Sequence, residues 1–220
     1  MERLKTFTTR DEAIKALASH IIQLIEEKQE IQNHSYILLS GGSTPLPLYK
    51  LLAESSIDFS KLTFGLVDER FVPVSEPQSN EGMIREIFQN QPSFQCIGMV
   101  TNDQNIKESI ENCLSTYPPF IGADLAILGM GSDGHFASLF PNDKASLEGL
   151  MGTNPQVLAT HAPDYPNHRI SCNLALLKTI KNRILLITGE EKLNKLKLCS
   201  KEGSPISYIF DSLTDIYYAP

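Results

Sequence analysis

The stretch 124–140 reads DLAILGMGSDGHFASLF and carries the pattern that decides the fold. It joins a short apolar run, 124–128, to a glycine-rich turn in which Asp133 and His135 flank a glycine. Such a run is typical of a strand that is buried on both faces of a parallel sheet. Because open α/β sheets bind ligands at the carboxyl ends of their strands, the turn predicts a polar ligand site. Asp-Gly is also a common turn dipeptide, so this stretch alone supports a plain turn equally well.

Two other segments have the same order of apolar run and polar turn. Residues 36–39 lead into SGGSTP at 40–45, and residues 62–67 lead into DER at 68–70. A helix is expected over 45–53, with Thr44 as its cap and Pro45 at its first position. Apolar periodicity predicts further helices over 10–29, with Thr9 as the cap, over 80–89 and over 105–116, and one that begins near 190. Short apolar runs predict strands at 95–99, 156–160 and 183–187.

This alternation of strands and helices predicts the fold class. We expect a single α/β domain, 1–220, with a doubly wound, mostly parallel sheet flanked by helices, as in Rossmann-like proteins. Residues 141–168 are rich in proline and glycine, so they are expected to be mostly loop around the strand at 156–160. Such a loop is a candidate mobile cover for the site.

Composition narrows the class of protein. The chain has 220 residues, of which 41% are hydrophobic and 20% charged, as in soluble globular domains. A net charge of -7 disfavours a nucleic-acid partner. The chain has no apolar run of the ~20 residues that span a bilayer and no secretory signal, so no membrane partner and a cytoplasmic location are expected. Four widely spaced cysteines, without CxxC or HxxxH, predict neither disulfides nor a metal site.

The polar residues at the strand ends suggest the chemistry of the site. Gly41, Gly42, Ser43 and Thr44 precede a helix, and their backbone amides suit an anion such as phosphate. The segment matches neither the GxGxxG fingerprint nor a P-loop, and a tight turn remains the alternative. Lys192 lies in the first turn of a helix, where a cation opposes the helix dipole unless an anion is near; a solvated lysine remains the alternative.

Charged side chains at the other strand ends are candidates for catalysis. The carboxylate of Asp68 can bind sugar hydroxyls or transfer a proton, and the guanidinium of Arg70 can bind an oxyanion. The alternative for this charged triplet is a surface salt-bridge cluster. His135 lies among glycines at a strand end, whereas His161 and His168 are expected in loops.

Five segments, in this order, carry a resemblance to a known family. They are LSGGSTP at 39–45, VDERFVP at 67–73 with SN at 79–80, LGMGSDGHFASLFP at 128–141, RIS at 169–171 and TGEEK at 188–192. The chain thereby resembles the 6-phosphogluconolactonases, within the wider group that includes the glucosamine-6-phosphate deaminases. The resemblance implies a sugar-phosphate isomerase-like fold. It also implies hydrolysis of 6-phospho-D-glucono-1,5-lactone to 6-phospho-D-gluconate, in the oxidative pentose phosphate pathway, without a metal or an organic cofactor.

The resemblance also implies a role for each candidate residue. Phosphate binding falls on the 41–44 turn, Arg169 and Lys192. His135 is expected to act as general base on water, with Asp133 as its positioning partner. Arg70 or backbone amides are expected to stabilise the oxyanion, and Asp68 to order sugar hydroxyls or to assist proton transfer.

Two alternatives of different kinds stay open. The first is a glucosamine-6-phosphate deaminase or isomerase, whose segment resembles DGHIAFNEP; here Phe140 stands where its additional acid would fall. The second is a non-catalytic sugar-phosphate sensor, because related folds serve in regulators. The absence of a helix-turn-helix segment from this sequence argues against the sensor. The expected partner is a small sugar-phosphate lactone, bound by a monomer or weak homo-oligomer. In the loop before Ser-Asn, where many relatives have Asp, this chain has Ser75 and Glu76.

Overall fold

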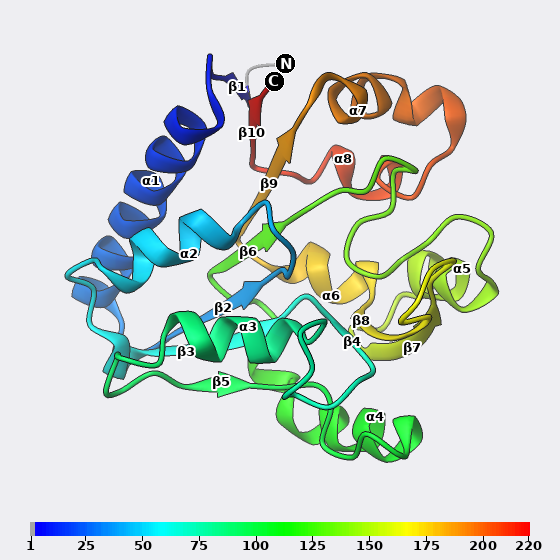
Figure 1. The fold of residues 1–220 in the computed structure, drawn as a ribbon, viewed down its shortest axis with the longest axis horizontal. Helices are drawn as coiled ribbons and strands as arrows, with labels where there is room; N and C mark the ends of the chain where they lie inside the picture. The colour runs from blue at the N-terminus through cyan, green and yellow to red at the C-terminus, as the bar shows by residue number, and fades with distance from the viewer. Residues whose placement is uncertain (1–2) are drawn as a thin grey trace.

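A computed structural model describes residues 3–220 of the chain. Within these residues, seven strands form one parallel sheet in the order β1-β10-β9-β6-β2-β3-β5, with β6 near its middle (Figure 1). The fold class is therefore confirmed. The strands are β1 Leu4–Thr6, β2 Ser35–Leu39, β3 Leu62–Leu66, β5 Cys96–Ile97, β6 Leu125–Leu128, β9 Asn182–Thr188 and β10 Asp215–Ala219.

The strand order contains a reversal that positions the site. From β2 the chain builds outward through β3 and β5, whereas from β6 it builds in the opposite direction through β9 and β10. Adjacent strands β2 and β6 are therefore the point at which the winding changes direction, and open α/β sheets bind ligands beyond the carboxyl ends of such strands. The turns after these two strands are the 40–45 and 129–135 segments, the two glycine-rich turns of the sequence.

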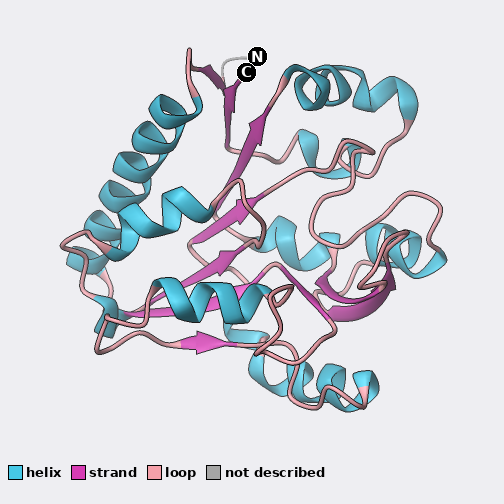
Figure 2. Ribbon diagram, in the orientation of Figure 1, coloured by secondary structure: helices cyan, strands magenta, loops and turns pink. Residues whose placement is uncertain are grey.

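Helices flank the sheet (Figure 2). The first of them, α1, begins with a capping box: the Thr9 hydroxyl accepts from the Glu12 amide, and the Glu12 carboxylate accepts from the Thr9 amide. Its apolar face contacts β2, β10 and the next helix. The helices are α1 Arg10–Ile31, α2 Leu46–Ala53, α3 Asn80–Ile87, α4 Ile106–Thr116, α5 Lys144–Met151, α6 Leu174–Thr179, α7 Glu190–Glu202 and α8 Ser207–Phe210, with 3-10 turns at Phe59–Lys61 and Pro118–Phe120.

The region 141–168 differs from its prediction as mostly loop. It contains the helix α5, which begins where the Asp143 carboxylate accepts from the Ser146 amide and hydroxyl. The strand expected at 156–160 is β7, Val157–His161. A side-chain cap and burial of Leu150 stabilise a helix here despite the local glycines.

A second, three-stranded antiparallel sheet was not predicted. It consists of β4 Asp68–Arg70, β8 His168–Cys172 and β7, in the order β4-β8-β7. His161 and His168 therefore lie opposite each other on strands, so their placement in loops was wrong. The pairing joins segments about a hundred residues apart, for which local sequence carries no signal.

The start of α2 also differs from the prediction. Pro45 occupies the N-cap position, no side chain caps the helix, and helical residues begin at Leu46. Thr44 therefore does not cap the helix. In the described part of the chain, no helix is long and apolar enough to cross a membrane.

Candidate active site

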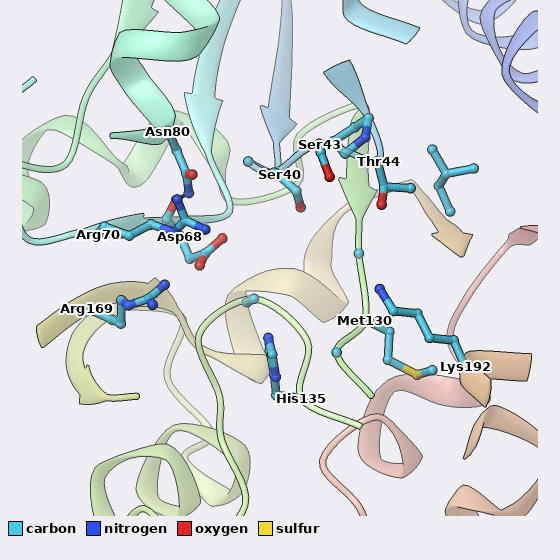
Figure 3. Close-up of a pocket in the computed structure, with 17 residues that line it drawn as sticks. Ser40, Ser43, Thr44, Asp68, Arg70, Asn80, Met130, His135, Arg169 and Lys192 are labelled. Atoms are coloured by element: carbon cyan, nitrogen blue, oxygen red, sulfur yellow. Dashed lines mark hydrogen bonds between the residues drawn. The ribbon is translucent and has the colours of Figure 1, made fainter. Parts of the chain in front are cut away.

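A cavity of about 300 Å³ lies beyond the carboxyl ends of β2 and β6 (Figure 3). Every residue predicted to bind substrate lines it, as do three of the four predicted catalytic residues; the fourth, Asp133, does not line it but is hydrogen-bonded to His135. The lining residues that the sequence predicts are Gly41, Gly42, Ser43, Thr44, Asp68, Arg70, His135, Arg169 and Lys192. Segments from both halves of the winding thus meet at one polar pocket.

The turn at 41–44, here called the phosphate loop, presents free backbone amides. Within residues 3–220, none of its four amides donates a hydrogen bond to a protein acceptor. Gly42 has a φ of 94°, a conformation that glycine adopts without strain. The loop is anchored at Ser40, whose hydroxyl donates to the Ile127 carbonyl at 2.6 Å and whose carbonyl accepts from the Tyr49 hydroxyl at 2.7 Å. A fixed turn with unpaired amides at a helix start is suited to an oxyanion.

His135 and Asp133 form a hydrogen-bonded pair. The His135 Nδ1 lies 2.6 Å from the Asp133 Oδ1, which also accepts the His135 backbone amide at 3.0 Å. Partial burial raises the pKa of Asp133, but these hydrogen bonds outweigh it and hold the pKa below its ordinary value. An ionised carboxylate accepts a proton from Nδ1, so in the neutral form of the ring the lone pair is on Nε2. Figure 3 shows the ring directed into the cavity, where that lone pair can accept a proton.

The DER segment is not a surface salt-bridge cluster. Asp68 is buried and accepts a short hydrogen bond from the Ser138 hydroxyl. Arg70 and Arg169 donate to backbone carbonyls, at 2.6 Å to Gln78 and at 2.7 Å to Pro166. Among residues 3–220, no carboxylate forms a salt bridge with either guanidinium. Two cations that lack ion pairs, one on β4 and one on β8, therefore line the same cavity.

The pKa values of two basic groups in the cavity are lowered, both by burial and one of them also by a like charge. The pKa of Arg169 is lowered first by burial and then by the nearby Arg70 charge. Burial also lowers the pKa of Lys192, which lies in the first turn of α7. An anion in the cavity would oppose both effects, because it stabilises the charged forms.

Glu69 has a role that sequence reasoning missed. Its carboxylate accepts from the backbone amides of Arg70, Asn80 and Glu81, at 2.6 to 2.7 Å, and from the Ser79 hydroxyl at 3.1 Å. Burial raises its pKa to about 7, against these four hydrogen bonds. Glu69 thereby ties β4 to the start of α3 and fixes its neighbours Asp68 and Arg70. The alternation of side chains along a strand was the available signal, because it turns Glu69 away from both neighbours.

Asn80 is a second residue that was missed as part of the site. Its Nδ2 donates to the Asp68 carbonyl at 2.8 Å, and this bond fixes the orientation of the amide. Its Oδ1 lies where a side chain at Gly41 would start: a Cβ there would be 1.7 Å away. Asn80 thus bridges β4 and the phosphate loop. The Ser-Asn pair at 79–80 was the only sequence signal for it.

Phe140 lies beside His135. The ring centroids are 4.5 Å apart, and the Arg169 guanidinium lies 5.8 Å from the Phe140 centroid. Phe140 is buried, so an apolar ring occupies the position at which the deaminase segment carries an acid.

The acidic groups do not form a metal-binding cluster. Across residues 3–220, no group of three or more His, Cys, Asp or Glu side chains is arranged to hold a metal ion. The cavity contains one carboxylate, one imidazole and three basic groups, a set that suits an anionic substrate and a proton transfer.

Comparisons with known proteins bear on the family of the chain. A family model described as glucosamine-6-phosphate isomerases/6-phosphogluconolactonase matches residues 8–215. The 6-phosphogluconolactonase of Caulobacter vibrioides is 33% identical over 86% of this chain and 84% of that protein. The 6-phosphogluconolactonase of Thermotoga maritima is 33% identical over 84% and 82%, respectively.

A solved structure extends the likeness to the fold. The crystal structure of a 6-phosphogluconolactonase from Shewanella baltica has a TM-score of 0.87 and 28% sequence identity. The match covers 99% of this chain and 97% of that one. The chain therefore belongs to the glucosamine-6-phosphate isomerase/6-phosphogluconolactonase family.

Proposed function

We propose that the protein is a 6-phosphogluconolactonase, which hydrolyses 6-phospho-D-glucono-1,5-lactone to 6-phospho-D-gluconate in the oxidative pentose phosphate pathway. The observation that carries the proposal is the His135–Asp133 hydrogen bond, in which His135 lines a cavity that also contains the basic groups of Arg70, Arg169 and Lys192. Phe140 favours the lactonase over the deaminase, because a phenyl ring cannot carry the additional proton that ring opening and deamination require.

In the proposed mechanism, the phosphate loop, Arg169 and Lys192 bind the 6-phosphate and place the lactone carbonyl near His135. The Nε2 of His135 takes a proton from a water molecule as the water oxygen bonds to the carbonyl carbon. Asp133 stabilises the imidazolium through the bond to Nδ1. Arg70 stabilises the tetrahedral oxyanion, and Asp68 orders a sugar hydroxyl or assists the proton transfer.

Collapse of the intermediate breaks the bond between the carbonyl carbon and the ring oxygen. The imidazolium returns its proton to that oxygen, so His135 is neutral again at the end of the cycle. The carboxylic acid product loses its own proton to solvent. No step requires a metal ion or an organic cofactor.

We further propose that residues 1–220 act as one sugar-phosphate lactonase domain. The proposal places the protein in the cytoplasm, as a monomer or weak homo-oligomer without a nucleic-acid or membrane partner. The net charge of -7 supports the exclusion of nucleic acid.

A hydrolysis assay tests the proposed function. Freshly generated 6-phosphogluconolactone is added to the purified protein, and formation of 6-phosphogluconate is followed after subtraction of spontaneous hydrolysis. We expect a rate that is proportional to protein concentration. A folded protein that gives no rate above the background would reject the lactonase assignment.

A further inference from the structure

Arg10 contacts the phosphate loop from outside the cavity. Its Nη2 donates to the Ser43 carbonyl at 2.6 Å and lies 3.3 Å from the Thr44 carbonyl. Arg10 is exposed and does not line the cavity, whereas Ser43 and Thr44 do. Within residues 3–220, no backbone amide donates to either carbonyl, apart from any bonds internal to a helix or a strand. The guanidinium is therefore their main protein partner.

The position of Arg10 opposes a local preference of helices. It is the first residue of α1, where the partial positive charge of the helix dipole disfavours a cation. The two following residues, Asp11 and Glu12, obey the preference. A residue that violates a local rule is commonly retained for a contact made elsewhere. The contact that Arg10 makes is with the phosphate loop.

Peptide geometry connects this contact to anion binding. In a trans peptide the carbonyl and the amide hydrogen point in opposite directions. The peptide that presents the Ser43 carbonyl to Arg10 therefore directs the Thr44 amide to the other side, toward the cavity that Thr44 lines. A cation on the carbonyl also polarises that peptide and increases the positive partial charge on its amide hydrogen.

We propose that Arg10 is a positioning residue for phosphate binding: it holds the Ser43 carbonyl outward and thereby aims the free Thr44 amide at the 6-phosphate, while its contact with the Thr44 carbonyl anchors the same turn. The inference rests on the proposed function for the identity of the anion. It adds a residue from the opposite side of the loop, with no direct contact to the substrate.

The test compares Arg10→Ala and Arg10→Lys with Lys15→Ala, which removes an exposed charge from the same helix. Circular dichroism checks that each variant is folded. For Arg10→Ala we expect KM for 6-phosphogluconolactone to rise about tenfold with kcat unchanged. Arg10→Lys, which keeps a charged donor, should recover part of the loss. For unphosphorylated gluconolactone, and for Lys15→Ala with either lactone, the constants should not change.

Three results would overturn the inference. An unchanged KM in Arg10→Ala, or an equal rise for both lactones, would show that Arg10 does not act through the phosphate. An equal effect of Lys15→Ala would show that only long-range charge is involved.

A binding experiment separates this inference from the proposed function. Calorimetric titration with inorganic phosphate and with 6-phosphogluconate measures anion binding in the absence of catalysis. Weaker binding in Arg10→Ala supports the inference even if the protein hydrolyses no lactone. Unchanged binding in Arg10→Ala, beside a loss in Arg169→Ala, rejects the Arg10 role and leaves the proposed function intact.

Discussion

Arg70 and Arg169 are directly opposite residues in the antiparallel pair of β4 and β8. Like charges placed opposite each other in a sheet destabilise it, and here no carboxylate among the described residues forms a salt bridge with either one. Each guanidinium is instead held in place by a backbone carbonyl. The pair is therefore prepared for an anion, which would relieve the repulsion.

Removal of a basic group should affect the phosphorylated substrate selectively. Arg169→Ala and Lys192→Ala should each lower kcat/KM for 6-phosphogluconolactone by roughly 1.5 to 3 kcal/mol, the range of a charged hydrogen bond. The loss for unphosphorylated gluconolactone should be much smaller, and Lys15→Ala serves as the charge control. Equal losses on both lactones would move the phosphate site elsewhere, with Arg70 as the next candidate.

Binding of the product should weaken at alkaline pH. Burial lowers the pKa of Lys192, so its ammonium loses a proton at lower pH than an exposed lysine does. A neutral amine attracts phosphate less, so the Kd of 6-phosphogluconate should increase as the pH rises through that lowered pKa. In Lys192→Arg the guanidinium stays protonated, and the increase should be absent. Calorimetric titrations over this pH range check it; parallel curves for both proteins would contradict the prediction.

A side chain at Gly41 should disrupt the bridge between the phosphate loop and β4. In Gly41→Ala the new Cβ would be 1.7 Å from the Asn80 Oδ1, so the buried amide must move and its bond to Asp68 is strained. We expect a loss of about 1 to 3 kcal/mol in the free energy of unfolding, as for overpacked cores. Gly129→Ala is the matched control, because a Cβ there meets no atom within 4 Å. Denaturant titration measures the free energy of unfolding of both variants. Equal values for Gly41→Ala and Gly129→Ala would refute the bridge.

The protein should not act as a deaminase. Purified protein mixed with glucosamine 6-phosphate should release no ammonia above background, because Phe140 cannot titrate where the deaminase segment has an acid. A known glucosamine-6-phosphate deaminase provides the positive control. Robust ammonia release would reverse the preference for the lactonase.

The centre of the parallel sheet was predictable because β2, β3, β6 and β9 are apolar runs that end in polar or glycine-rich turns, whereas β1 and β10 were not predicted. The same turns pointed to the phosphate loop, His135 and Lys192, all of which line one cavity. Lys192 was recognisable by its unfavourable place in a helix, a local conflict that sequence displays directly.

The remaining features depend on contacts that no local pattern encodes. The sheet β4-β8-β7 joins distant segments, and the role of Glu69 depends on the start of α3, which lies next to it only in the fold. Helix α5 was concealed by the glycines and prolines around it. Arg10 was not recognised because its two acceptors are carbonyls, which every residue has.

The most direct test of the account is the turnover of His135→Ala with 6-phosphogluconolactone, after subtraction of spontaneous hydrolysis. Loss of the general base should lower kcat by on the order of 10² to 10⁴. KM should change little, because the groups proposed to bind the phosphate are untouched, and circular dichroism should show an intact fold. A folded His135→Ala variant with near-normal kcat would contradict the central claim that His135 activates the water.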